Sequence, residues 1–358
     1  MPSFDVQLGA RSHPVHVAAG LLARLGQLAA GVGLAGRCVI VTDYTVGALY
    51  LKTVEAALKG AGFDPAVIRI APGEASKSSA GLGRIYDGLI EAGLDRSHAV
   101  FALGGGVVGD LAGFAAATYL RGVPLVQVPT TLLAQVDSAL GGKTAIDHPR
   151  GKNLIGAFYQ PRLIVADVET LRSLGEREFR EGLAEVIKYG AIMDAPLIDH
   201  LEHSLQNILG REPRALEIIV ERSLRHKAFV VERDEQESDL RTILNFGHTV
   251  GHALEMSAGY GHYLHGEAVA IGMTAASRLS CLHAGLAPAE ARRLQKLIET
   301  AGLPVELPAG WLNEDFARAL RLDKKRAAGT IRFVLLDRLG HALVRALEFD
   351  QVTAALAS

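Results

Sequence analysis

Cysteine is almost absent from this chain of 358 residues. The only two cysteines, Cys38 and Cys281, lie far apart and form no C-x-x-C motif, which argues against a disulfide framework and against a metal site built from thiolates. Excess charge is lacking too. The net charge is -2, and no basic run is interleaved with aromatic residues, so the sequence gives no sign of a nucleic-acid-binding surface.

Long uninterrupted apolar runs are also missing. The most apolar stretch, residues 99–120, is broken by Asp110 and five glycines, so it predicts a buried strand followed by a helix and not a membrane span. The first residues contain neither a basic region nor a long apolar segment, which argues against a secretory signal. We therefore expect a soluble, cytoplasmic protein without a membrane or nucleic-acid partner.

The apolar residues that are present, with 49% of the chain hydrophobic, are enough for a sizeable core, and the length suits two domains. Up to about residue 174, short apolar runs alternate with segments of helical spacing, which is typical of βαβ units and a mainly parallel, Rossmann-like sheet. Beyond it, the spacing is almost entirely helical. We predict an α/β domain over residues 1–174 and an all-helical C-terminal domain over residues 175–358, apart from a β-hairpin near 330–344, with the active site in the cleft between them.

The individual elements follow from the same periodicity. Two short strands are expected within residues 3–18 and a helix at 21–30; the main predicted strands are 38–43, 67–71, 98–103, 123–129 and 163–167. The predicted helices of the second domain are 176–188, 195–208, 213–232, 245–255, 266–284, 288–301 and 313–322.

A group of histidines suggests a metal site. Four of the thirteen histidines fall between positions 248 and 265, and His248 and His252 are four apart on a predicted helix, so their rings share one face. A zinc protease would have a glutamate after the first histidine, and Thr249 stands there instead. A metal site still needs a third ligand. Histidines clustered by chance at the surface are the alternative.

Glu185 is a candidate for that third ligand. It lies among apolar neighbours, where a carboxylate is costly unless it is paired or bound to a metal. Together with two histidines it would make the His₂Glu set of a catalytic zinc. The alternative is an ordinary ion pair with Lys188, three residues further along the helix.

A glycine-rich turn at residues 104–110 matches G-x-G-x-x-G, follows an apolar strand and opens a helix. Such glycines allow backbone N–H groups to approach a pyrophosphate. The match is imperfect, since it lies in the third βα unit and no acid follows about twenty residues later; Asp43, at an earlier strand end, could accept from a ribose hydroxyl instead. A turn that merely packs helix on strand is the alternative.

Loops at the same sheet edge carry further polar residues. Thr130 and Thr131 end a strand and suit either a helix N-cap or a phosphate contact. Residues 137–153 predict a long loop with cationic side chains, which suits an anionic ligand but equally a flexible surface. Lys324 and Lys325, taken alone, are typical of a solvated surface.

Taken together, the motifs resemble the 3-dehydroquinate synthases, sugar phosphate cyclases of the shikimate pathway. The matching segments occur in family order over nearly the whole chain. They are residues 73–77, 104–110, 119–122, 128–138, 141–145, 152–158, 182–188, 244–255, 265–273 and 323–325.

The resemblance implies a divalent metal, Zn²⁺ or alternatively Co²⁺, held by Glu185, His248 and His265. This differs from the pairing of His248 with His252, because the family uses the histidine at position 252 to contact substrate. The resemblance also implies bound NAD. The expected NAD-binding residues are Asp43, Glu74, Lys77, Gly106, Val107, Val108, Gly109, Asp110, Thr130, Thr131, Lys143, Lys152, Thr170, Leu171, Arg172 and Ser173.

The implied substrate is a sugar-acid phosphate, 3-deoxy-D-arabino-heptulosonate 7-phosphate. The family pattern assigns its carboxylate to Lys143 and Arg241 and its hydroxyls to Asp137 and Lys188. The same pattern assigns its phosphate to Asn245, His252 and one or both of Lys324 and Lys325. Arg121 matches a residue that the family contributes to the neighbouring subunit's phosphate site, which implies a homodimer.

The implied reaction begins with oxidation of the C5 alcohol by NAD⁺, followed by elimination of phosphate. Re-reduction by the same NADH, ring opening and intramolecular aldol closure then give 3-dehydroquinate. The net reaction is that of a lyase in aromatic amino acid and chorismate biosynthesis.

Three alternatives remain at the level of sequence. Another sugar phosphate cyclase is one, although Lys143 and Arg241 favour a substrate with a carboxylate. A metal-dependent polyol dehydrogenase of the same fold would consume NAD⁺ stoichiometrically. A non-catalytic metal- and nucleotide-binding regulator is the third.

Overall fold

The computed structural model describes residues 3–237, 239–259, 261–324 and 330–357. The chain forms two compact units, the first made of Met1–Leu174 and Leu216–Glu232, the second of Gly175–Ala215 and Arg233–Ser358. The change of periodicity predicts a single boundary after residue 174. The structure differs, because most of helix α7 (Pro213–Arg233) belongs to the first unit.

Contacts with the N-terminal strands explain why most of α7 clusters with the first unit. Its Glu217 accepts a hydrogen bond from the Ala19 N–H at 3.1 Å, and the guanidinium of Arg225 lies 4.6 Å from the ring centre of Phe4. These contacts join residues about two hundred positions apart. Periodicity identifies α7 as a helix but cannot show where it packs.

The first unit is built on a seven-stranded sheet in the order β1-β2-β9-β6-β5-β3-β4. All neighbouring strands are parallel except β1 and β2. The mainly parallel sheet predicted from the sequence is therefore confirmed. The strands are β1 (Ser3–Val6), β2 (His13–Ala18), β3 (Arg37–Asp43), β4 (Asp64–Ile70), β5 (Ala99–Gly104), β6 (Leu125–Pro129) and β9 (Leu163–Asp167).

Helices cover both faces of this sheet, which is why its central strands are apolar at successive positions. On β3, Ile40 packs in the cluster that contains α1 (Leu25–Gly31) and α2 (Tyr44–Gly60). Its neighbours Val39 and Val41 pack with α3 (Ser79–Glu91) and α4 (Gly106–Thr118) on the other face.

The segment 137–153 differs from the loop expected. A π-helical turn, Ala134–Ser138, is followed by the antiparallel hairpin β7 (Lys143–His148) and β8 (Gly151–Phe158). Ile146 of β7 is buried in the same core as α4, so tertiary packing stabilises a strand whose apolar run is too short to predict one.

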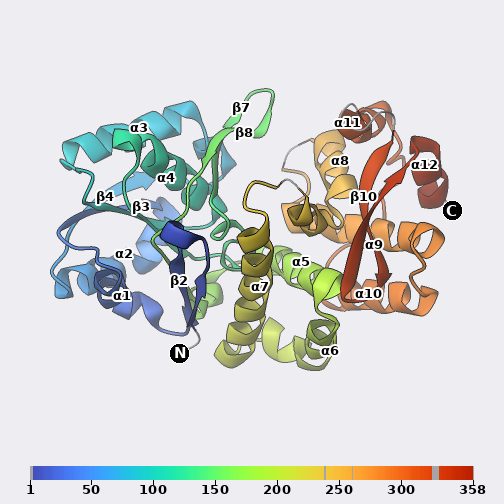
Figure 1. Ribbon diagram of the computed structural model, residues 1–358, viewed down its shortest axis with the longest axis horizontal. Helices are drawn as coiled ribbons and strands as arrows, with labels where there is room; N and C mark the ends of the chain where they lie inside the picture. Colours follow the sequence, from blue (N-terminus) through green and yellow to red (C-terminus); the bar gives the residue numbers. More distant parts are fainter. Residues whose placement is uncertain (1–2, 238, 260, 325–329, 358) are drawn as a thin grey trace. The chain divides into compact units, whose positions relative to one another are not determined.

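The second unit is mainly helical, with one antiparallel hairpin formed by β10 (Ile331–Arg338) and β11 (His341–Leu347), as predicted (Figure 1). The terminal helix α12 was not among the predicted elements. The helices are α5 (Glu176–Met193), α6 (Ala195–Leu209), α8 (His248–Ala258), α9 (His265–His283), α10 (Pro288–Thr300), α11 (Glu314–Lys324) and α12 (Phe349–Ala357).

Two absences expected from the sequence concern the described part of the chain. None of its helices has the length and hydropathy that a membrane span requires. Cys38 and Cys281 are both unpaired, as their separation predicts.

Candidate functional site

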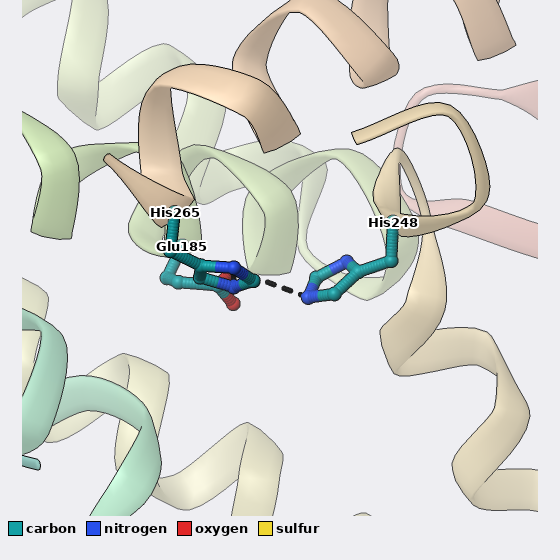
Figure 2. A group of neighbouring side chains, drawn as sticks. All are labelled: Glu185, His248 and His265. Atoms are coloured by element: carbon teal, nitrogen blue, oxygen red, sulfur yellow. Dashed lines mark ion pairs between the residues drawn. The ribbon is translucent and has the colours of Figure 1, made fainter. Parts of the chain in front are cut away.

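Three side chains from separate helices of the second unit meet at one point: Glu185 of α5, His248 of α8 and His265 of α9 (Figure 2). The Nε2 atoms of His248 and His265 lie 3.6 and 3.8 Å from Oε1 of Glu185. Ligand atoms around a tetrahedral zinc, at bond lengths of about 2.0–2.2 Å, are about 3.3–3.6 Å apart. The separations are thus close to those a metal ion requires and long for direct hydrogen bonds.

The carboxylate of Glu185 is completely buried. Among the described residues, neither of its oxygens accepts a hydrogen bond, although Oε2 forms an ion pair with the ammonium of Lys188. Lys188 compensates Oε2, but Oε1, which faces both imidazoles, has no donor in the described part of the chain, and burying such an oxygen costs free energy. The donor set therefore fits a divalent metal, and two imidazoles with one carboxylate is a set typical of catalytic zinc.

The ring of His248 is held with Nε2 toward Glu185. Its Nδ1 lies 3.2 Å from the carbonyl oxygen of Phe246, which can only accept, so Nδ1 carries the hydrogen. Burial, and next the positive charge of Lys188, lower the pKa of His248 well below its usual value. The imidazole is therefore neutral at physiological pH, which is the form that binds metals.

His265 has a different electrostatic environment. Burial alone would lower the pKa of His265, but the hydrogen bond to Glu255 and the charge of Glu185 outweigh it and raise the pKa. The carboxylates of Glu185 and Glu255 therefore favour the protonated form of this ring, against the effect of burial. A bound metal would compete with a proton for this ring, since metal binding releases protons from its ligands.

His252 does not join His248 in a common ligand group within the described part of the chain. The two rings on α8 are 5.3 Å apart, but His252 belongs to a second group, with Glu255 and His265. The hypothesis that an i,i+4 pair supplies both imidazoles therefore differs from the arrangement found. The reason is that α9 brings His265 beside His248 from outside the helix.

Local contacts and backbone conformation determine that α8 begins at His248 and α9 at His265. Gly247 has a φ of +82°, a left-handed conformation that turns the chain so that α8 starts at His248. At α9, the Leu264 N–H donates to the Glu267 carboxylate at 2.9 Å, and Arg177 of α5 holds the same carboxylate at 2.7 Å. Each histidine therefore occupies the first position of its helix.

In the first unit, the glycine-rich turn leads directly into α4, which begins at Gly106. The preceding Gly105 forms no side-chain cap, so the first N–H groups of α4 have no capping side chain. Directly after β6, the Thr130 hydroxyl is buried and has no hydrogen-bond partner among the described residues, whereas Thr131 accepts from the Ala134 N–H at 3.2 Å. A helix N-terminus and an unpaired buried hydroxyl fit a phosphate-bearing cofactor.

The predicted NAD-binding residues have varied structural roles. Asp43 caps α2 by accepting from the Val46 N–H at 2.9 Å, which is a local structural role; its contact with NAD stays a prediction. The buried ammonium of Lys77 contacts Asp110 at 2.5 Å and also Asn153. Burial raises the pKa of Asp110, and Lys77 opposes that shift.

The other predicted NAD-binding residues lie before Lys77, in the 3₁₀ helix after β9, and on the hairpin β7–β8. Burial also raises the pKa of Glu74, with Lys77 opposing it. Residues 170–173 form part of a 3₁₀ helix (Val168–Ser173), where Gln135 and Tyr50 hydrogen-bond to Thr170 and Ser173. Lys143 begins β7 and Lys152 lies on β8.

Asp137 contacts a residue that the sequence analysis did not name. Lys227 of α7 donates to the Asp137 carboxylate and to its carbonyl oxygen, each at 2.7 Å. The sequence feature that could have identified Lys227 is its position within a helical apolar pattern, among the buried residues Leu224, Ala228 and Val231. It was missed because α7 was predicted to lie in the second domain, away from Asp137.

The remaining predicted substrate-binding residues belong to several different elements. Arg241 is buried in the second unit and donates to the Glu235 carbonyl oxygen at 2.7 Å. Asn245 ends the 3₁₀ helix Leu240–Asn245, ahead of α8 instead of within it. Arg121 is exposed with a φ of +67°, directly after Leu120 at +49°. The prediction for Lys324 concerns a side chain outside the described part, and Lys325 lies outside the described residues.

Two family models match consecutive parts of the chain. The model of the 3-dehydroquinate synthase N-terminal region matches residues 67–181, and that of the 3-dehydroquinate synthase C-terminal region matches residues 182–326. The chain belongs to the 3-dehydroquinate synthase family. The glycine-rich turn and the group formed by Glu185, His248 and His265 both lie inside the matched regions.

Individual relatives agree with this assignment. A 3-dehydroquinate synthase of Pelobacter propionicus is 51% identical over 98% of each chain, and one of Desulforamulus reducens is 50% identical over 95% of each. Among solved structures, a 2-epi-5-epi-valiolone synthase from Streptomyces hygroscopicus, with NAD⁺ and Zn²⁺ bound, is 30% identical over 96% of each chain, with a TM-score of 0.88. The family and the fold class predicted from the sequence are therefore confirmed.

Proposed function

We propose that this protein is a phosphate-eliminating lyase that converts 3-deoxy-D-arabino-heptulosonate 7-phosphate into 3-dehydroquinate and inorganic phosphate, with NAD and a divalent metal as cofactors. The observation that carries the proposal is identity of 50–51% to 3-dehydroquinate synthases over nearly the full length of both chains. No carbon atom is lost in this conversion: the C–O bond to phosphate breaks, a new C–C bond closes the ring, and NAD is regenerated in each cycle.

Glu185, His248 and His265 would hold the metal, which we propose is Zn²⁺, with Co²⁺ as a substitute. Their donor types and separations support this assignment. A metal bound there polarises substrate oxygens and lowers the pKa of the alcohol to be oxidised. Lys188, beside Glu185, would contact a substrate hydroxyl.

The first unit would bind NAD. The pyrophosphate would face the N-terminus of α4 at Gly106–Asp110, where N–H groups and the helix dipole favour anions. Lys77 is a further candidate, and so is Thr130, whose buried hydroxyl has no hydrogen-bond partner in the described part of the chain. NAD held there would supply reversible hydride transfer and would be regenerated in each turnover.

Polar and cationic residues would orient the substrate. We assign its carboxylate to Lys143 and Arg241, and its phosphate to Asn245, His252 and the lysines at 324 and 325. Asp137 would contact a hydroxyl. Fixing the phosphate and the ring relative to one another supplies much of the rate, because orientation replaces a loss of entropy in the transition state.

The decisive experiment measures phosphate release from the heptulosonate phosphate by zinc-loaded enzyme, with NAD(H) absorbance followed in parallel. We expect many phosphates per enzyme, no net NADH, and loss of activity on chelation. Steady accumulation of NADH without phosphate would instead identify a polyol dehydrogenase.

A second substrate distinguishes this activity from that of another sugar phosphate cyclase. A heptulose phosphate that lacks the carboxylate should be a poor substrate, because the groups assigned to the carboxylate would be left without their partner. Equal kcat/KM for both substrates would contradict the assignment of Lys143 and Arg241.

We further propose a homodimer in which Arg121 acts in the neighbouring subunit. Arg121 is exposed and has a positive φ, a constrained backbone conformation, and both features support a contact with another chain. Mixing inactive Arg121→Ala and Glu185→Ala chains should restore about a quarter of wild-type activity, since only mixed dimers contain an intact site. No recovery in demonstrably mixed dimers, or a fully active monomer in sedimentation, would refute the role in trans.

A further inference from the structure

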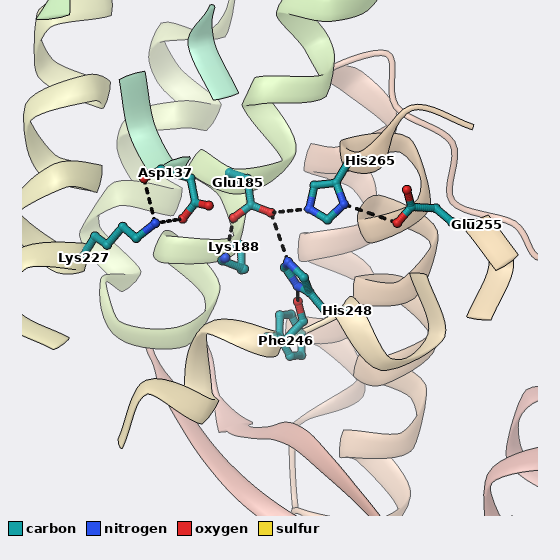
Figure 3. A network of polar contacts seen from close by, with 8 residues as sticks. All are labelled: Asp137, Glu185, Lys188, Lys227, Phe246, His248, Glu255 and His265. Atoms are coloured by element: carbon teal, nitrogen blue, oxygen red, sulfur yellow. Dashed lines mark hydrogen bonds and ion pairs between the residues drawn. The ribbon is translucent and has the colours of Figure 1, made fainter. Parts of the chain in front are cut away.

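Two possible metal-binding groups share a single ring, that of His265. One contains Glu185 and His248, and the other contains His252 and Glu255. The two ring nitrogens face different carboxylates: Nε2 lies 3.8 Å from Glu185, and Nδ1 lies 3.4 Å from Glu255 (Figure 3). The tautomer of this ring, that is, which of its two nitrogens carries the hydrogen, therefore determines which group can receive a metal.

The chemistry of imidazole resolves the choice. A neutral ring carries hydrogen on one nitrogen and a lone pair on the other, and only the lone pair binds a metal. The Glu255 side chain is 9% exposed, and as a carboxylate it only accepts hydrogen bonds. It therefore favours hydrogen on Nδ1 and leaves the lone pair on Nε2, which faces Glu185.

The other histidine of the site is oriented in the same way by a different group. The Phe246 carbonyl oxygen, 3.2 Å from Nδ1 of His248, fixes hydrogen there and leaves Nε2 for the metal (Figure 3). Acceptors behind metal-binding histidines set the tautomer and orient the ring. The two rings thus present equivalent nitrogens to one carboxylate.

We infer that Glu255 is a positioning residue that holds His265 with Nε2 toward the metal, and that the group of His252, Glu255 and His265 is not a second metal site. The inference deepens the proposed function, since it concerns the same metal. It predicts one metal ion per chain.

The test is zinc binding to metal-free, full-length protein, measured by competition with a chromophoric chelator. We expect Glu255→Ala to weaken zinc affinity by about 10–100-fold, the usual effect of removing such an acceptor. Glu255→Gln keeps an oxygen acceptor and should lose several-fold, less than Glu255→Ala. The Co²⁺ absorption spectrum of Glu255→Ala should also shift, because the ligand geometry changes.

Two further variants serve as controls. Glu202→Gln removes a surface carboxylate that pairs with Arg293, and should bind zinc like the wild type. His252→Ala should also keep wild-type zinc affinity, because His252 is not a ligand in this scheme. Thermal unfolding of each metal-free variant separates loss of a ligand orientation from loss of the fold.

Wild-type zinc affinity in Glu255→Ala would overturn the inference, as would two zinc ions per chain or a His252→Ala loss as large as that of Glu255→Ala. If Glu255→Ala does not fold, unchanged affinity in Glu255→Gln would overturn it. The proposed function fails separately: an enzyme that releases no phosphate while Glu255→Ala still loses zinc would leave this inference intact.

Discussion

At the scale of single residues, the main feature of the second unit is a pair of charges with almost no exposure to solvent. Glu185 is fully buried and Lys188 is 2% exposed, and they form an ion pair along one face of α5. Removing one partner of such a pair leaves an unpaired buried charge, whereas replacing both by apolar groups is often neutral.

This contrast predicts the behaviour of the metal-free protein. Glu185→Leu and Lys188→Met should each lower the free energy of unfolding of the second unit by about 3–5 kcal/mol, and the double variant should recover most of that loss. Urea denaturation of the four proteins gives the comparison. Additive losses in the double variant would show that the two charges do not stabilise one another.

A second residue-scale prediction concerns His13 of β2, which is 2% exposed. Burial lowers the pKa of His13, although the Arg11 carbonyl oxygen opposes the shift. Below the unfolded-state pKa of about 6.5 the unfolded chain binds the proton more readily than the folded one, so stability falls as the pH falls.

His13→Asn keeps an N–H donor but cannot titrate in this range. Relative to this variant, wild type should lose up to about 1.4 kcal/mol per pH unit below pH 6.5. Denaturation from pH 7.5 to 5 measures the difference, with exposed His203→Asn as the control. Parallel pH profiles for wild type and His13→Asn would contradict the prediction.

At the scale of elements, the crossing of α8 and α9 brings His248 near His265. Gly272 of α9 lies against the chain just before α8: a Cβ at this position would be 1.9 Å from the Gly247 carbonyl oxygen. The absence of a side chain therefore allows the two backbones to approach closely, and the sequence needs glycine here for packing.

Gly272→Ala should force the helices apart, lowering the stability of the second unit by about 1–3 kcal/mol and weakening zinc binding. Gly83→Ala is the matched control: it lies within α3, and a Cβ there meets nothing within 4 Å. That change should be neutral or stabilise by about 0.5–1 kcal/mol. Unfolding curves and zinc titration measure both effects, and a tolerated Gly272→Ala would show that the crossing is not tightly constrained.

At the scale of the whole molecule, the candidate sites are divided between the two units. All three proposed metal ligands belong to the second unit, and the glycine-rich turn belongs to the first. A ligand stabilises the part of the protein that binds it, by about 2.7 kcal/mol at 100 times its Kd.

Zinc at that excess should therefore slow amide hydrogen exchange by up to about 100-fold in α5, α8 and α9, with little effect on β3, β5 and β6. NAD should give the opposite pattern. Mass spectrometry of exchanged peptides measures both. Equal protection of the two units by zinc alone would show that they unfold as one cooperative body.

The sequence by itself determined most of the elements and the fold class. Buried strands such as β3 and β5 are continuous apolar runs, and the change to helical spacing near residue 174 marked the second unit. Glu185 stood out because a carboxylate on an apolar helix face needs a partner, and the glycine-rich turn because it joins a strand to a helix. These features are local, so spacing alone reports them.

Only the tertiary structure decided which distant residues meet. The hairpin β7–β8 and the return of α7 to the first unit depend on packing, and with them the contact of Lys227 with Asp137. Spacing suggested that His252 joins His248 in one ligand group. In the fold His265 joins it instead, and Glu255 contacts the other ring nitrogen of His265. The physical reason is that helical periodicity orders side chains only within one helix, while the approach of α5, α8 and α9 depends on the packing of the whole unit.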